Sequence, residues 1–247
     1  MWDGERRSVS ISTGKERLMS EENRKAIRIS VRNLVEFVLR SGDIDNRRSG
    51  NAQKDAMLAG GRIHRKIQKR MGSGYRAEVP LKHEVQDEEQ EITLLVEGRA
   101  DGIFTENGIP VIDEIKGMYT DISRLEEPIE VHLAQAMCYG YFYCCDKDLD
   151  GIRLQMTYCN LETEEIKRFQ TDRSREELET WFSGVVHEYF KWARYLYHHE
   201  LTRDASIGHL EFPFPYRAGQ RDLVVSVYRT VSRKKRLFIQ APTGIGK

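Results

Sequence analysis

The fold follows from two runs, Val96-Glu97-Gly98-Arg99-Ala100-Asp101-Gly102-Ile103-Phe104 and Val111-Ile112-Asp113-Glu114-Ile115-Lys116-Gly117, which flank the pair Asn107-Gly108. Asn-Gly favours a type I′ turn because both residues tolerate positive φ, so the stretch predicts a β-hairpin. With a two-residue loop, Glu106 faces Ile109. The register continued from that pair places Asp101 opposite Glu114, and Arg99 opposite Lys116.

Charged residues on one face of this hairpin suggest a catalytic site. Two carboxylates that face each other on neighbouring strands repel, and a divalent cation such as Mg²⁺ offsets that repulsion. Lys116 shares the face of Asp101 and Glu114, where it can orient an attacking water and stabilise negative charge. The set therefore suits metal-assisted hydrolysis of a phosphodiester. The alternative is a solvated charge ladder in which Arg99 and Lys116 neutralise the two acids.

The order of these residues resembles a known enzyme core. Gly98-Arg99-Ala100-Asp101-Gly102 followed by Ile112-Asp113-Glu114-Ile115-Lys116 is similar to PD-(D/E)xK nucleases, the RecB-like branch in particular. Ala100 stands where the family name has proline, at a position that varies in the family. The resemblance implies an α/β fold with a restriction-endonuclease-like core, a small mixed β-sheet flanked by helices. It also implies a DNA nuclease that uses Mg²⁺ or Mn²⁺, with Asp101, Glu114 and Lys116 as catalytic residues.

A helix before the hairpin carries a further candidate ligand. Residues 52–71 are predicted to be helical, with Ile63, Ile67 and Met71 on one stripe and His64 beside it. A single helical histidine is more often structural or exposed than a ligand. The resemblance, however, implies that His64 and the carbonyl of Ile115 join Asp101 and Glu114 around the metal.

A helix after the hairpin carries candidate substrate-support residues. Residues 130–144 are predicted to be helical, and Gln135 and Tyr139 resemble the Gln-x-x-x-Tyr motif that follows the core in RecB-like nucleases. An amide and a phenol one turn apart can hydrogen-bond to the lysine, to waters or to phosphate. Gln135, Tyr139 and Arg99 are therefore expected to support bound DNA.

The composition bounds the class of protein. The 247 residues contain 39 Lys+Arg and 39 Asp+Glu, so any basic groove for nucleic acid must be local. No apolar run is long enough to span a bilayer, and residues 1–24 lack an apolar signal core. We therefore expect a soluble, cytoplasmic protein with no membrane partner. The four cysteines, which lack a metal-binding spacing, are expected to be reduced and mostly buried. They are Cys138, Cys144, Cys145 and Cys159.

The pattern along the chain divides it into three parts. These are a polar tail at residues 1–26, a nuclease domain at residues 27–205, and a linker with the start of a helicase ATP-binding domain at residues 206–247. Strands are expected at residues 27–31, 75–85, 92–104, 111–116, 151–160 and 165–169, and helices at residues 33–40, 52–71 and 130–144. A further helix is expected after Ser174, with Glu177 completing a capping box. The aromatic stripe on this last helix is predicted to be core; it includes Trp181, Phe182, Tyr189, Phe190, Trp192 and Tyr195.

The C-terminal part resembles the start of a second enzyme. Residues 237–240 are expected to form a buried parallel strand, and Gly244-Ile245-Gly246-Lys247 after it resembles a Walker A loop. Tyr216-Arg217-Ala218-Gly219-Gln220 resembles the adenine-reading motif of DinG/XPD-type superfamily II DNA helicases. The resemblance implies a truncated P-loop segment in which Gln220, Gly244, Gly246 and Lys247 contribute to ATP binding in a full-length parent.

Such a parent would combine unwinding with cutting, in DNA repair or recombination, and the nuclease domain would work beside its own helicase motor. The alternative function is a catalytically inactive nuclease fold that binds DNA and positions the helicase. A third possibility is a structural adaptor whose charge ladder is merely solvated. The presence of Asp101, Glu114 and Lys116 together favours the nuclease.

Overall fold

The computed structural model describes residues 24–41, 50–87, 91–211 and 213–240, without the side chains of residues 50–57. The predicted tail up to residue 23 therefore lies outside the described residues, as do Gly244, Gly246 and Lys247. The chain separates into two compact units, Met1–Tyr197 and His198–Lys247. No helix in the described ranges is both long and apolar enough to cross a membrane.

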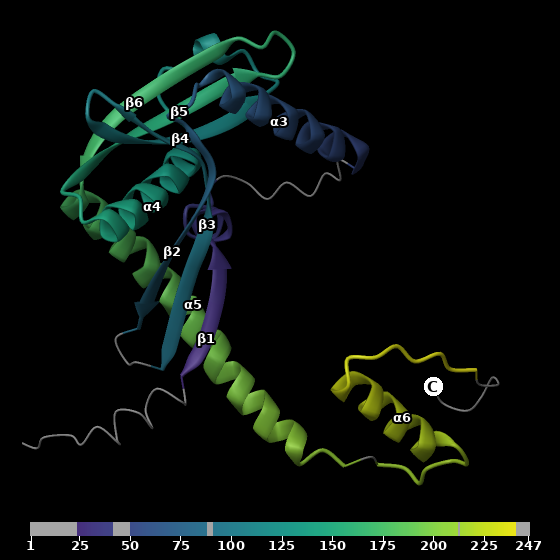
Figure 1. The fold of residues 1–247 in the computed structure, drawn as a ribbon. Helices are drawn as coiled ribbons and strands as arrows, with labels where there is room; N and C mark the ends of the chain where they lie inside the picture. The colour runs from purple at the N-terminus through teal and green to yellow at the C-terminus, as the bar shows by residue number, and fades with distance from the viewer. Residues whose placement is uncertain (1–23, 42–49, 88–90, 212, 241–247) are drawn as a thin grey trace, which may run out of the picture. The chain divides into compact units, whose positions relative to one another are not determined.

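The first unit is built on a six-stranded mixed sheet (Figure 1). Its strands are β1 (Lys25–Ser30), β2 (Arg76–Gln86), β3 (Ile92–Glu106), β4 (Ile109–Met118), β5 (Gly151–Asn160) and β6 (Ile166–Ser174). The strands β2, β3 and β4 form an antiparallel meander, and β6 is antiparallel to β5. β1 lies parallel to β3, and β5 lies parallel to β4. The expected fold class, a mixed sheet flanked by helices, is confirmed.

The hairpin between β3 and β4 has the predicted register near its turn. Asn107 and Gly108 have φ values of 51° and 82°, and the ladder runs from Glu106–Ile109 to Gly102–Asp113. There it ends, one residue before Asp101 and Glu114. Earlier in β3, residues 92–97 pair with β1 instead. The predicted pairings of Asp101 with Glu114 and of Arg99 with Lys116 are therefore wrong, because the two strands diverge and form a fork beside Asp101.

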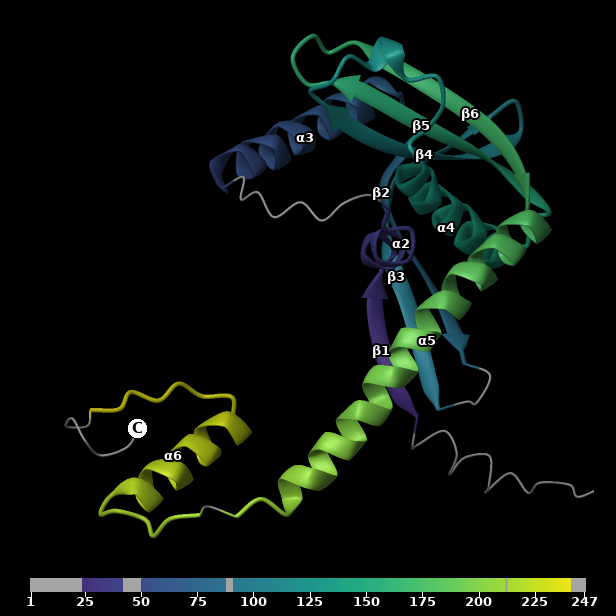
Figure 2. The same ribbon diagram turned by 180° about the vertical axis from the view of Figure 1, so that it is seen from behind.

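Helices cover both faces of the sheet. They are α2 (Val31–Val38), α3 (Gly50–Arg70), α4 (Glu130–Lys147) and α5 (Arg175–Gly208), with a 3₁₀ turn, η1, at Ile122–Arg124. α4 packs against β4 and β5 and contacts α2 and α5, as Figure 2 shows from behind. Ile112 of β4 belongs to this main core, whereas Ile115 packs with Ile63 and Ile67 of α3. Because alternate strand residues point to opposite faces, α3 and α4 lie on opposite sides of β4.

α5 begins with the predicted capping box. The amide of Glu177 donates to Ser174 Oγ at 3.1 Å, and the amide of Ser174 donates to the Glu177 carboxylate at 2.9 Å. The expectation that the whole aromatic stripe is core is wrong in part, since Trp192 is 45% exposed and Tyr195 59%. The buried stripe is narrower than predicted, and its members follow helical spacing. They are Leu178, Phe182, Val185, Val186, Phe190 and Ala193.

The second unit contains α6 (Gln220–Ser232). The expected strand at residues 237–240 is wrong, since these residues are irregular and Phe238 is 95% exposed. A parallel strand needs neighbouring strands to accept its backbone hydrogen bonds, and the described residues of this unit include no strand. The apolar sequence of the segment was therefore insufficient to make it a strand.

Candidate active site

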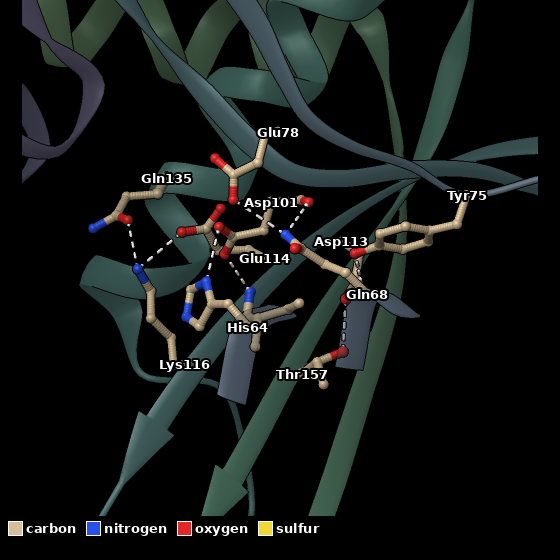
Figure 3. A network of polar contacts seen from close by, with 11 residues as sticks. His64, Gln68, Tyr75, Glu78, Asp101, Asp113, Glu114, Lys116, Gln135 and Thr157 are labelled. Carbon is tan, nitrogen blue, oxygen red and sulfur yellow. Dashed lines mark hydrogen bonds and ion pairs between the residues drawn. The ribbon is translucent and has the colours of Figure 1, made fainter. Parts of the chain in front are cut away.

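The fork between β3 and β4 places the Asp101 carboxylate between the two strands. Asp101 Oδ2 accepts the amide hydrogen of Ile115 at 2.8 Å, so a side chain replaces the missing ladder partner. Asp101 Oδ1 lies 3.1 Å from His64 Nδ1, a contact drawn as a dashed line in Figure 3. This contact contributes to raising the pKa of His64, although burial, the larger influence, acts to lower it. Two elements remote in sequence, α3 and β4, therefore meet at Asp101.

Glu114 and Lys116 lie beside this carboxylate on β4. Lys116 Nζ is 2.8 Å from Glu114 Oε1 and donates to Gln135 Oε1 of α4 at 2.7 Å (Figure 3). Glu114 is only 4% exposed, and its second oxygen, Oε2, is buried without a hydrogen-bond partner in the described structure. Burial raises the pKa of Glu114 to about 7; Lys116 opposes this increase, and the negative charge of Asp101 adds to it. The arrangement is a desolvated acid pair with one cation attached.

The raised pKa of Glu114 predicts a pH-dependent stability for the metal-free protein. Between about pH 4.5 and about pH 7, the folded protein retains a proton on Glu114 that the unfolded chain has released. The free energy of unfolding should therefore fall as pH rises through this window, by at most about 3 kcal/mol. Urea denaturation at the two ends of the window measures the change. The same decrease in Glu114→Gln would show that another group is responsible.

The other predicted support residues, Tyr139 and Arg99, lie near the acid pair along β3 without a hydrogen bond to either acid in the described structure. Tyr139 packs against β3, where a Cβ added to Gly98 would come within 2.6 Å of its hydroxyl oxygen. That hydroxyl hydrogen-bonds to the backbone of Arg99, while burial raises the pKa of Tyr139. The Arg99 side chain is exposed. The fork thus joins His64, Asp101, Glu114, Lys116, Gln135 and the amide of Ile115, with Tyr139 and Arg99 along β3; the roles assigned to these residues stay predictions.

Glu78 and Gln68 were missed by sequence reasoning. Glu78 lies in β2 directly across from Asp101, where the ladder is interrupted between Ala77–Gly102 and Val79–Ala100. Gln68 of α3 donates to Glu78 Oε1 at 3.1 Å and to the carbonyl of Asp101 at 3.0 Å (Figure 3). The sequence of the predicted strand at residues 75–85 does not indicate how it pairs with β3, so it does not place Glu78 across from Asp101. A third carboxylate at the fork could therefore not be recognised.

The left-handed backbone conformation of Glu78 should lower the free energy of unfolding. Its φ of 54° lies in the left-handed region, which costs a residue with a side chain about 1–2 kcal/mol relative to right-handed conformations. Glu78→Gly should therefore have a larger free energy of unfolding than Glu78→Ala, by about 1 kcal/mol. Chemical denaturation of the two variants, which both lack the carboxylate, measures the difference. In an ordinary strand the order is reversed, and that order would contradict the strained conformation.

Asp113 adjoins Glu114 in sequence but lies in a different network. It is fully buried and accepts hydrogen bonds from Tyr75 Oη at 2.9 Å, Gln155 Nε2 at 3.0 Å and Thr157 Oγ1 at 2.6 Å. Burial raises the pKa of Asp113, and the three donors oppose this increase. These hydrogen bonds join β4 to β5 and to Tyr75, so Asp113 stabilises the sheet.

The fork contains oxygen donors of the kind that a divalent cation needs. In the described ranges, no three His, Cys, Asp or Glu side chains converge into a ready metal-binding group. The chemistry of the donors nevertheless fits Mg²⁺ or Mn²⁺, since Glu114 offers a buried oxygen without a partner next to the Asp101 carboxylate. His64, a softer ligand, contacts Asp101 Oδ1. The residues present therefore fit a hard cation.

Comparisons with known proteins identify distant structural similarity. No family model and no curated protein matches the sequence. The crystal structure of SSO0001 is similar with a TM-score of 0.43 and 16% identity, covering 70% of this chain and 82% of that one. An alkaline exonuclease, LHK-Exo, from Laribacter hongkongensis has a TM-score of 0.37 and 13% identity over 71% of this chain and 94% of its own. The structure of LHK-Exo in complex with dAMP has a TM-score of 0.38 and 13% identity, and the match covers 76% of this chain and 98% of that one. Similarity at this level establishes neither a family nor an activity.

Proposed function

We propose that the first unit is a metal-dependent deoxyribonuclease with Asp101, Glu114 and Lys116 as its catalytic residues. The observation that carries the proposal is the buried, unpartnered oxygen of Glu114 next to Asp101, with Lys116 attached to the same carboxylate. An unpaired buried carboxylate oxygen is costly, and a bound cation would offset that cost. The nuclease domain is proposed to occupy residues 27–205, which extend along α5 beyond the end of the first unit at Tyr197.

Each residue has a part in the proposed hydrolysis. Asp101 and Glu114 would hold Mg²⁺ or Mn²⁺, with His64 and the carbonyl of Ile115 as further ligands. When bound, the cation supplies a Lewis acid and an activated water. Lys116 would position the water or stabilise negative charge on the phosphate. The ammonium group of Lys116 is held in place by its hydrogen bond of 2.7 Å to Gln135 Oε1. The amide of Ile115 fixes the orientation of Asp101.

Cleavage of end-labelled DNA tests the proposal. The wild-type chain should cut single- or double-stranded DNA only when Mg²⁺ or Mn²⁺ is added, and Asp101→Asn should cut at least about 100-fold more slowly. Glu188→Gln, which changes an exposed acid of α5, is the matched control and should cut normally. The product ladder distinguishes endonuclease from exonuclease action. Equal cutting by Asp101→Asn would overturn the proposal.

One observation favours the second candidate, an inactive DNA-binding module. Both Asp101 oxygens are engaged by protein groups, and Glu114 Oε1 is paired with Lys116. A site closed in this way resembles a structural ion-pair network. If the wild type binds DNA but never cuts it, with either metal, and Asp101→Asn and Lys116→Ala bind equally well, the module is favoured over the nuclease.

We also propose that residues 206–247 begin a helicase ATP-binding domain, so that the parent protein unwinds and cuts DNA in repair or recombination. The support is the sequence around Gln220 and from Gly244 to Lys247, together with an apolar face of α6 left exposed in its unit. That face includes Val224, Val227, Tyr228 and Val231. In a full-length parent, Lys247→Ala should abolish ATP-dependent unwinding and leave DNA cleavage by the nuclease domain intact; unwinding that survives the substitution would overturn this assignment.

A further inference from the structure

A pocket lies beside the fork, on the two strands that carry Asp101 and Glu78. Its volume is about 460 Å³. It is lined by Pro80, Leu81, Lys82, Glu97, Gly98 and Arg99. Arg99 precedes Asp101 by two residues in β3, which corresponds to about 7 Å along an extended strand. The pocket is therefore adjacent to the candidate active site and not part of it.

The register of β2 and β3 connects the pocket to the fork. Glu78 lies across from Asp101, the next outward pair is Pro80–Arg99, and the pair after it is Lys82–Glu97. On the opposite side of the ladder, Leu81 of β2 and Val96 and Ala100 of β3 are buried. Lys82 and Arg99 are exposed, so their side chains lie on the solvent side of the ladder. An extended chain that leaves the fork along these strands passes both cations.

The charges of the pocket indicate its ligand. Within the described ranges, neither Lys82 nor Arg99 forms an ion pair or a side-chain hydrogen bond, whereas Arg153 of the same sheet is neutralised by Glu106 and Asp172. Two cations without acidic partners suit phosphate oxygens, which Arg and Lys bind through charge-assisted hydrogen bonds. Pro80 adds an apolar surface between them, which a sugar or base can cover. The combination fits a nucleotide better than a simple anion.

We propose that this pocket binds one nucleotide of single-stranded DNA next to the position of cleavage, with its phosphates held by Lys82 and Arg99. The inference rests on the proposed nuclease function and specifies its substrate as a single strand. A pocket of about 460 Å³ is the size of a small-molecule site, which admits one nucleotide and not the two strands of a duplex. Glu97, across from Lys82, is placed to accept hydrogen bonds from a base.

Salt-dependent DNA binding tests the pocket separately from catalysis. The full chain is titrated with a labelled single-stranded oligonucleotide of mixed sequence in EDTA, over a series of NaCl concentrations, by fluorescence anisotropy. Each lost phosphate contact removes about 0.7 from the slope of log K against log salt. The double variant Lys82→Ala/Arg99→Ala should therefore have a slope smaller by about 1.4 than the wild type. Arg124→Ala, which removes an exposed cation of η1, should leave the slope unchanged.

A charge-conserving double variant, Lys82→Arg/Arg99→Lys, should retain the wild-type slope, which separates lost charge from a disturbed fold. An unchanged slope in the double alanine variant would overturn the pocket and leave the nuclease proposal standing. An equal loss with duplex of the same sequence would overturn the single-strand assignment. A wild type that binds no DNA at any salt concentration would overturn the pocket and the DNA substrate together. Intact pocket binding without metal-dependent cleavage would overturn the nuclease proposal alone.

Discussion

Lys116→Ala should lower the rate of metal-dependent DNA cleavage by about 10²–10³-fold, the loss typical when one fixed donor to a developing charge is removed. The ammonium group of Lys116 is held by Glu114 at 2.8 Å and by Gln135 at 2.7 Å, so it is fixed before any substrate arrives. A group fixed in this way requires no reorganisation during the reaction. Single-turnover cleavage with saturating enzyme measures the chemical step without the effect of DNA binding.

A change of pH dependence should accompany the loss of rate. Lys116 lowers the pKa of Glu114 in the metal-free protein, so its removal should move that pKa above about 7 and extend the pH-dependent fall in the free energy of unfolding to higher pH. Lys66→Ala, which removes a surface lysine paired with Glu164, is the matched control. It should change neither the rate nor the pH profile. A Lys116→Ala protein that cuts at the wild-type rate would exclude Lys116 from catalysis.

Asp113→Ala should lower the free energy of unfolding by about 3–5 kcal/mol, the second large effect that the structure predicts. Three donors, from Tyr75, Gln155 and Thr157, would lose their shared acceptor, and each unsatisfied buried polar group costs about 1–3 kcal/mol. Gln155 Nε2 lies 3.4 Å from Thr157 Oγ1, so these two groups can partly satisfy each other when the carboxylate is removed. The expected loss is therefore smaller than the sum of three full penalties. Urea denaturation monitored by circular dichroism measures the loss.

Two further variants show whether the loss comes from this network. Asp113→Asn keeps the shape and one acceptor oxygen, so it should be less destabilising than alanine. Asp172→Ala, which removes an exposed partner of Arg153, should change stability by less than about 1 kcal/mol. If Asp113→Ala were as stable as the wild type but inactive in cleavage, Asp113 would belong to the active site instead of the fold.

Local sequence signals predicted the hairpin well. Asn107-Gly108 fixes the turn, and the turn fixes the register, so the pairs from Glu106–Ile109 to Gly102–Asp113 follow from adjacent residues. The fork could not be predicted in the same way. It depends on β1, whose pairing with residues 92–97 joins segments more than sixty residues apart along the numbering. Nothing in either segment specifies that parallel contact.

In the candidate site, too, local contacts could be predicted from the sequence and long-range contacts could not. The spacing of Glu114 and Lys116 places both on one face of β4, and their contact follows from strand geometry alone. The position of Glu78 depends on the register of β2 and on a left-handed backbone, neither of which its residues indicate. At residues 237–240 the apolar sequence predicted a strand that the structure does not contain, because the described part of this unit offers no neighbouring strand to pair with.

The fork has a consequence for how the site can be observed. The amide hydrogen of Ile115 is held by the Asp101 side chain, whereas the amides of an ordinary antiparallel ladder are held by backbone carbonyls. Its protection from solvent exchange therefore depends on where one carboxylate points. A ligand that draws Asp101 away releases this amide while the ladder from Gly102 to Glu106 stays closed. The hydrogen-exchange rate of the Ile115 amide thus reports whether the Asp101 carboxylate is hydrogen-bonded to β4 or engaged by a ligand.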